Sequence, residues 1–294
     1  MAVPPVIITA VPTAFTRTGE LNIDGTREIF RKSATSGVDG AFVLGTTGEF
    51  PSLSFDERGR VAEVAVEELA GKRCIIHVGA ASAFEVLRLI DQAREAGATE
   101  IAAITPYYLS ATDAALLAYY TAISEASDGL RVYVYAFRAR TGNFVSPELM
   151  GKLAALPNIV GAKVSGESLD QIAAYRAAVP DEFIIYTGSD RDVVHAVERG
   201  AQGIVSGVGS ALPGPFLEAA SRIAAGASRA ELDAAQAAVN DAVDVIGGNF
   251  ASIKTALTLQ GIDAGYVRMA IDEPDDAKLA DIKRTVQRFG ALAG

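Results

Sequence analysis

One lysine of the chain stands where a charged side chain is not expected. Lys163 lies in the segment NIVGAKVSG (158–166), inside an apolar run typical of a strand buried on both faces. Burial penalises the ammonium form and favours a neutral amine, the nucleophile that condenses with a ketone to form a Schiff base. The alternative is a structural lysine paired with a carboxylate, with Glu167 the nearest acid in the run, and position alone leaves both open.

The remaining lysines fall in segments that read as helices or their flanks, where a solvated cation is expected. They are Lys32, Lys72, Lys152, Lys254, Lys278 and Lys283.

Three further clusters also follow apolar runs. The segment LGTTGE (44–49) combines glycines, backbone amides and the hydroxyls of Thr46 and Thr47, which suits a carboxylate or a phosphate, although a plain strand-to-helix turn would look the same. TPYY (105–108) and YAFRARTG (135–142) offer phenols that could relay protons and arginines that could hold a carboxylate. A core role is expected for Tyr107, and surface ion pairs are the alternative for the arginines.

Eight short apolar runs supply these positions, and amphipathic helical patterns separate them. The runs span residues 6–11, 40–44, 74–78, 100–104, 131–135, 159–164, 183–186 and 203–205. Their spacing is that of one βα unit, which predicts a closed (β/α)8 TIM barrel, an α/β fold, with the catalytic groups at the carboxyl ends of its strands. A doubly wound sheet is the alternative, but the glycine-rich segment 206–214 lacks the spacing of a dinucleotide-binding fingerprint.

The end of the chain reads as helices alone, over residues 229–245, 250–260 and 275–289. We therefore expect a catalytic barrel over residues 1–225 and a C-terminal helical extension over residues 226–294.

Composition excludes several classes of protein. A formal charge of -10 disfavours binding to nucleic acid or to an anionic membrane, and no segment reads as a signal peptide or a membrane helix. A single cysteine, Cys74, and two histidines exclude a disulfide framework and a standard zinc cluster. We expect a cytoplasmic protein without a metal or other cofactor.

Taken together, the four clusters in this order resemble the dihydrodipicolinate synthase / N-acetylneuraminate lyase family of Schiff-base pyruvate aldolases. The resemblance covers nearly the whole chain, from about Val6 into the C-terminal helices. It implies that Lys163 forms the Schiff base with a 2-oxo acid, usually pyruvate. It also implies a homotetramer, a dimer of dimers, in which Tyr108 reaches the neighbouring subunit's site.

Roles for the other site residues follow from the same resemblance. Tyr135 would shuttle protons, linked through Thr46 to Tyr108. Thr46, Thr47 and the turn up to Gly48 would hold the oxo-acid carboxylate. The predicted substrate-binding side chains are completed by Arg140, which would meet a carboxylate on the aldehyde, by Arg138 at the mouth, and by Val205.

The sequence also departs from the family pattern. The usual Tyr-Asn-Val-Pro is YAFR (135–138) here, so an amide is lost and a cation is gained near the second substrate. Residues Phe50, Phe55 and Ala81 are apolar where lysine-inhibited synthases carry polar groups, so feedback inhibition by lysine is not expected.

The predicted activity is a lyase reaction that joins or cleaves pyruvate and an aldehyde, in the manner of dihydrodipicolinate synthase. The main alternative is an aldolase or dehydratase acting on N-acetylneuraminate or a 2-keto-3-deoxy sugar acid. A non-catalytic oxo-acid-binding protein and a barrel enzyme that binds phosphate in the loop Ser206–Ser210 are further alternatives.

Overall fold

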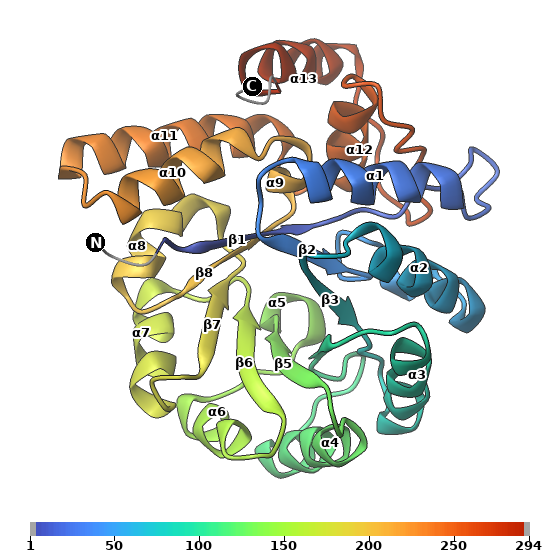
Figure 1. Ribbon diagram of the computed structural model, residues 1–294, viewed down its shortest axis with the longest axis vertical. Helices are drawn as coiled ribbons and strands as arrows, with labels where there is room; N and C mark the ends of the chain where they lie inside the picture. Colours follow the sequence, from blue (N-terminus) through green and yellow to red (C-terminus); the bar gives the residue numbers. More distant parts are fainter. Residues whose placement is uncertain (1–3, 291–294) are drawn as a thin grey trace.

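The computed structural model describes residues 4–290, and its centre is a closed barrel of eight parallel strands (Figure 1). The strands are β1 (Val6–Ala10), β2 (Gly40–Val43), β3 (Arg73–His77), β4 (Glu100–Ile104), β5 (Arg131–Ala136), β6 (Ile159–Val164), β7 (Ile184–Thr187) and β8 (Gly203–Ser206). Each lies within one residue of a predicted run at both ends. The predicted TIM barrel is therefore confirmed.

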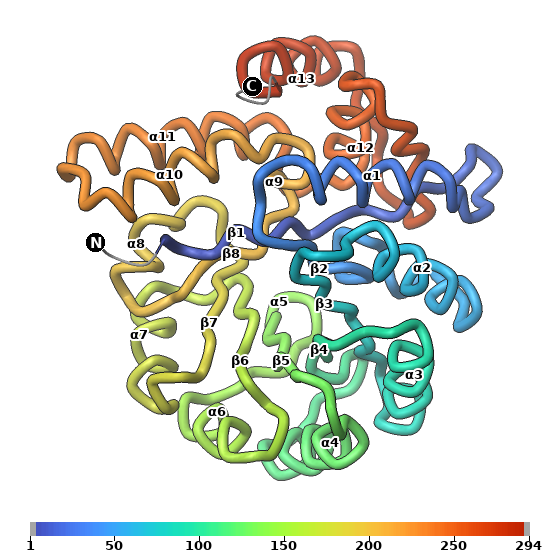
Figure 2. The backbone as a smooth tube through the Cα atoms, in the orientation of Figure 1, coloured from blue at the N-terminus to red at the C-terminus, as the bar shows by residue number. Residues whose placement is uncertain are grey.

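Helices separate the strands, and the backbone passes repeatedly from an inner strand to an outer helix (Figure 2). Those around the barrel are α1 (Ile23–Thr35), η1 (Phe50–Ser52), α2 (Phe55–Glu68), α3 (Ala83–Glu95), α4 (Asp113–Ala126), α5 (Arg138–Thr141), α6 (Pro147–Ala154), α7 (Leu169–Ala178), η2 (Asp190–Asp192), α8 (Val193–Glu198), α9 (Val208–Ala211) and α10 (Gly214–Ala224). Short polar side chains fix where many of them begin. Ser54 caps α2 in a reciprocal capping box with Glu57, and Ser82 and Thr112 cap the next two long helices.

Side chains fill the barrel interior, so it is a packed core and not a pore. One cluster of buried side chains comes from several strands and includes Ile8, Phe42, Ile75, Tyr133 and Tyr186. Near the amino ends of the strands, Tyr133 donates a hydrogen bond of 2.7 Å to the Glu100 carboxylate. The predicted site residues lie at the opposite end, where the strands finish.

Three further helices follow the barrel: α11 (Arg229–Ile246), α12 (Phe250–Thr258) and α13 (Asp276–Phe289). They gather on one side of the molecule, where α11 packs against α10 and α13, and α12 packs against α9 (Figure 1). The predicted helical region is therefore present. The predicted boundary between the barrel and the helical extension, after residue 225, stays a prediction. Helices α10 and α11, on either side of this boundary, pack against each other.

A buried ion pair attaches this helical region to the barrel. Lys254 Nζ, on α12, lies 2.6 Å from Glu49 Oε1, and both side chains are shielded from solvent. The second carboxylate oxygen accepts the backbone N–H groups of Arg268 and Met269, each at 2.8 Å. The expectation that Lys254 is solvated was wrong. The α12 face that carries it packs inward, and Glu49 supplies the charge that makes its burial tolerable.

None of the helices within residues 4–290 is long and apolar enough to cross a membrane.

The ion pair predicts an unequal effect of two lysine substitutions on stability. Lys254→Met leaves the Glu49 carboxylate buried without its ammonium partner, so the free energy of unfolding should fall by about 3–5 kcal/mol. Lys152→Met removes an exposed pair with Glu148 on α6 and should cost about 0.5 kcal/mol or less. Urea denaturation followed by circular dichroism measures both. Equal losses in the two variants would contradict a structural role for the buried pair.

Candidate active site

Lys163 lies at the carboxyl end of β6, inside the barrel, and only 6% of the residue is exposed. Its Nζ lies 3.9 Å from the centre of the Tyr135 ring and 4.9 Å from the centre of the Phe42 ring. No carboxylate oxygen of residues 4–290 lies within ion-pairing distance of this nitrogen. Glu167, the acid that sequence offered as a partner, is therefore not paired with it. A lysine that lacks a carboxylate partner and lines a cleft suits a nucleophile better than a structural lysine.

A hydroxyl pair lies beside the lysine. Thr46 Oγ1 and Tyr135 Oη are 2.9 Å apart, a hydrogen bond in which either oxygen could donate. Tyr135 is fully buried on β5, and β5 pairs with β6 so that Tyr135 is the register partner of Lys163. A phenol held by a second hydroxyl next to an amine can pass protons to and from the reacting atoms.

The turn that carries Thr46 is held in a strained form by a buried histidine. Leu44 and Glu49, at its two ends, adopt left-handed backbone angles of 59° and 55° in φ. His77 Nδ1 lies 2.9 Å from the Leu44 carbonyl oxygen, while its Nε2 accepts the Ile104 N–H at 3.2 Å. Nδ1 must then carry the proton. Burial holds the pKa of His77 well below its usual range, so the ring stays neutral and keeps this geometry.

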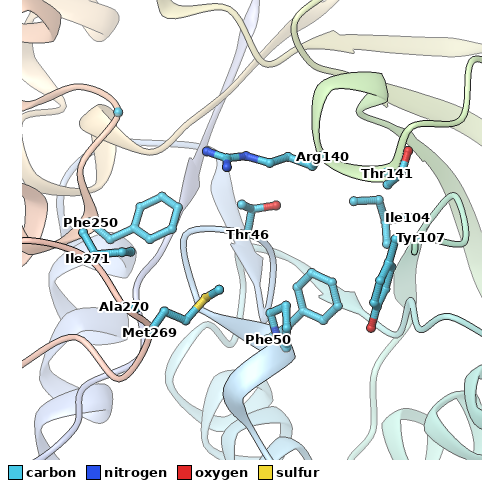
Figure 3. A pocket seen from close by; sticks show the side chains of 12 residues that line it. Thr46, Phe50, Ile104, Tyr107, Arg140, Thr141, Phe250, Met269, Ala270 and Ile271 are labelled. Carbon is cyan, nitrogen blue, oxygen red and sulfur yellow. The ribbon is translucent and has the colours of Figure 1, made fainter. Parts of the chain in front are cut away.

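The site opens into two adjoining chambers. The first, which we call the lysine chamber, has a volume of about 310 Å³. The second, the outer chamber, has a volume of about 420 Å³. Figure 3 shows the side chains that line the outer chamber. The lysine chamber is lined by Lys163 and by polar groups that include Thr47, Ser165, Ser189 and Asp190. Both chambers are lined by Thr46, Arg140, Gly248 and Phe250, so they form one continuous cleft.

Asp190 is an acid of this site that the sequence reading did not select. Its Oδ1 is buried and has no hydrogen-bond partner within the described part of the chain. Burial raises the pKa of this carboxyl to about 6, against smaller opposing effects of the Ser206 hydroxyl and the Lys163 amine. Asp190 follows β7, the strand that pairs with the Lys163 strand, and an acid three residues beyond a buried run was the signal that could have identified it.

Of the two arginines predicted to bind substrate, only Arg140 lines the cleft. Arg140 lines both chambers and extends over the cleft toward Phe250 (Figure 3). Arg138 lines neither chamber; its guanidinium lies 5.2 Å from the centre of the Phe144 ring, near Glu167. Arg138 therefore lies outside the cleft of its own chain, and its predicted role in substrate binding stays a prediction. In the one-turn helix α5, residues two apart project about 200° from each other, so only one of them can face the cleft.

Of the remaining predicted site residues, two line the cleft and two lie outside it. Thr47 and Val205 line the lysine chamber. Gly48 lines neither chamber; its carbonyl accepts a 3.0 Å hydrogen bond from the Thr13 hydroxyl and so braces the turn from behind. Tyr108 is 94% exposed and also lies outside both chambers of its own chain. Its backbone is left-handed, with a φ of 80°, and projects the phenol outward.

Tyr107 differs from its expected core role, because it lines the outer chamber and is only half-buried. The loop Ser206–Ser210 directs its hydroxyls inward: Ser206 Oγ accepts the Gly209 N–H and Ser210 Oγ donates to the Gly207 carbonyl. The hydroxyl hydrogen of Ser210 is therefore already used within the loop. No group of three or more His, Cys, Asp and Glu side chains in residues 4–290 is arranged to hold a metal ion.

Comparisons with known proteins agree with this geometry. The chain matches the model of the dihydrodipicolinate synthetase family over residues 4–289. It is 31% identical over 289 residues to a 4-hydroxy-tetrahydrodipicolinate synthase of Thermosynechococcus vestitus, covering 97% of each chain. A second synthase of that name, from a Cyanothece species, is also 31% identical, over 97% of this chain and 98% of the relative.

Solved structures show the same likeness. One is YagE, a prophage protein of Escherichia coli K12 that belongs to the dihydrodipicolinic acid synthase family, in complex with pyruvate. It superposes with a TM-score of 0.88 at 27% identity, covering 98% of this chain and 99% of that one. The dihydrodipicolinate synthase of Thermotoga maritima gives a TM-score of 0.89 at 26% identity, with 98% and 99% covered.

A family match over nearly the whole chain, the closed barrel and a lysine at the end of β6 point to one conclusion. The predicted class, a Schiff-base aldolase or synthase that uses pyruvate, is thereby confirmed at the level of the family. The chain belongs to the dihydrodipicolinate synthetase family of lyases.

Proposed function

We propose that the chain condenses pyruvate with an aldehyde, or cleaves the product of that reaction, through a Schiff base on Lys163. The observation that carries this proposal is the buried Lys163 amine, unpaired with any described carboxylate, 3.9 Å from the ring centre of Tyr135. The pyruvate bound to YagE supports the first substrate. Both synthases at 31% identity support the direction of condensation.

The proposed reaction begins when Lys163 Nζ attacks the keto carbon of pyruvate, whose carboxylate is held by Thr46 and Thr47. Loss of water gives an iminium, and removal of a methyl proton gives an enamine. The enamine carbon then attacks the aldehyde carbon, and the carbonyl oxygen takes a proton from the Tyr135 hydroxyl, which Thr46 can resupply. Water finally hydrolyses the iminium and frees the lysine. Arg140 lies where it can bind a carboxylate of the acceptor.

A second candidate is a sugar-acid aldolase or dehydratase. It is favoured by the polar groups of the lysine chamber, Ser165, Ser189 and Asp190, which could accept and donate hydrogen bonds to substrate hydroxyls. Turnover of a 2-keto-3-deoxy sugar acid with release of pyruvate would support it over condensation with other aldehydes.

A homotetramer is proposed as the working form, with Tyr108 of one subunit completing the site of another. Its support is the 94% exposure of Tyr108 on a left-handed backbone, a costly placement for a phenol that has no hydrogen-bond partner among residues 4–290. We also propose a cytoplasmic location, since the single cysteine, Cys74, is compatible with a reducing compartment.

Trapping with borohydride tests the nucleophile. Pyruvate plus sodium borohydride should convert the imine to a stable secondary amine, and peptide mass spectrometry should find that adduct on Lys163. Lys163→Met should give no adduct, whereas Lys152→Met, altered at an exposed lysine, should be labelled as fully as the native chain. An adduct that persists in Lys163→Met would contradict the proposal.

The hydroxyl pair predicts a kinetic difference between conservative variants. Tyr135→Phe removes the proton donor and should lower kcat about 10²–10⁴-fold while the KM for pyruvate changes little. Thr46→Val should lower kcat in the same direction, and Thr46→Ser, which keeps the hydroxyl, should recover most of it. Steady-state rates of pyruvate consumption provide the measurement. Undiminished kcat in Tyr135→Phe would rule out the proton relay.

The proposed assembly predicts a mass of four chains in solution by light scattering. Tyr108→Phe should leave that mass unchanged and lower kcat, because only the hydroxyl is lost. A monomer with full activity would contradict both the tetramer and the role of Tyr108 across the interface.

A further inference from the structure

The outer chamber contrasts with the lysine chamber in its chemistry. Its walls are mostly apolar: Phe50 and Ile104 on the barrel side face Phe250, Met269 and Ile271 on the C-terminal side (Figure 3). Tyr107 packs edge-on against Phe50, with ring centres 5.8 Å apart. Of the residues that the structure describes, no Asp, Glu, Asn or Gln lines this chamber.

Most hydroxyl groups of the outer chamber are already engaged with other protein groups. Thr46 Oγ1 shares its hydrogen bond with Tyr135. Thr141 Oγ1 accepts from Thr105 at 2.9 Å and donates to the Phe137 carbonyl oxygen at 3.3 Å. A substrate tail with several hydroxyl groups would find only the Tyr107 hydroxyl and the Arg140 guanidinium as further side-chain partners among the described lining residues, which opposes its binding.

Among the described residues, one cationic side chain lines the outer chamber. Arg140 is the only charged side chain among the described residues that line it, and its guanidinium lies 5.8 Å from the centre of the Phe137 ring. The arrangement suits a substrate with an apolar body and, at most, one anionic group near the junction of the two chambers.

The outer chamber adjoins the lysine chamber, and this position indicates which part of a substrate the outer chamber would bind. The two chambers join through Thr46, Arg140 and Phe250, so a molecule in the outer chamber can present its carbonyl carbon to an enamine on the lysine. The pyruvate-derived part is already assigned to the polar lysine chamber. The outer chamber is then left for the body of the second substrate.

We propose that the acceptor of this enzyme is an apolar, ring-bearing aldehyde whose ring occupies the outer chamber between Phe50 and Phe250. This inference rests on the proposed condensation at Lys163 and names its second substrate class. The bond formed joins the enamine carbon to the aldehyde carbon. The carbonyl oxygen gains one proton, and hydrolysis of the iminium releases a 4-hydroxy-2-oxo acid with the ring on carbon four, so no oxidant or reductant is needed.

A panel of aldehydes tests the inference. Benzaldehyde and cyclohexanecarboxaldehyde, each with pyruvate, should give kcat/KM values at least about tenfold above those of D-erythrose and aspartate semialdehyde. Products are identified by mass spectrometry. A preference for D-erythrose or aspartate semialdehyde would overturn the inference, and so would the absence of turnover with every aldehyde while pyruvate is still trapped on Lys163. Failure of trapping itself would instead remove the proposed function.

Two variants locate the effect in the outer chamber. Ile271→Asn places an amide in the apolar wall and should lower kcat/KM for benzaldehyde about tenfold or more, with unchanged borohydride trapping of pyruvate. Phe84→Asn, the same kind of change at a side chain that is 75% exposed on α3, should leave both measurements unchanged. Equal benzaldehyde kinetics in Ile271→Asn and the native chain would overturn the placement of the ring.

Discussion

The carboxylate of Glu49 holds together the two sides of the cleft. Glu49 is the last residue of the turn that carries Thr46 and Thr47. Its carboxylate pairs with the Lys254 ammonium at 2.6 Å and accepts hydrogen bonds from the N–H groups of Arg268 and Met269. A buried carboxylate is tolerated only when its oxygens are satisfied, so the segment after α12 must stay where its amides meet Glu49. That segment continues into Ala270 and Ile271, the outer wall of the cleft.

The barrel supplies the other constraint. Strands β5 and β6 are parallel neighbours in the barrel, and their register places Tyr135 beside Lys163. Aromatic rings enclose the amine, and no described carboxylate is close enough to pair with it. Lys163 therefore lines the cleft without an ion-pair partner, in a position to form a covalent bond to a keto carbon.

The charge at the cleft differs from the charge of the whole molecule. The chain carries a formal charge of -10, yet the charged side chain that lines both chambers is a cation, Arg140. An anionic oxo acid is therefore attracted by local groups and not by the surface as a whole. Arg138 lines neither chamber, and its role in substrate binding stays a prediction.

The sequence by itself determined the barrel, the strand boundaries and the lysine, because strands buried on both faces are continuously apolar and a charged residue inside one is conspicuous. It also located the turn with Thr46 and Thr47, since the ends of parallel strands must meet at one rim. Only the tertiary structure decided that Lys254 is buried, because its partner Glu49 is 205 residues away along the chain. The same holds for Asp190, Arg138 and the apolar wall at Met269 and Ile271, whose positions depend on how loops and helices from distant segments pack over the rim.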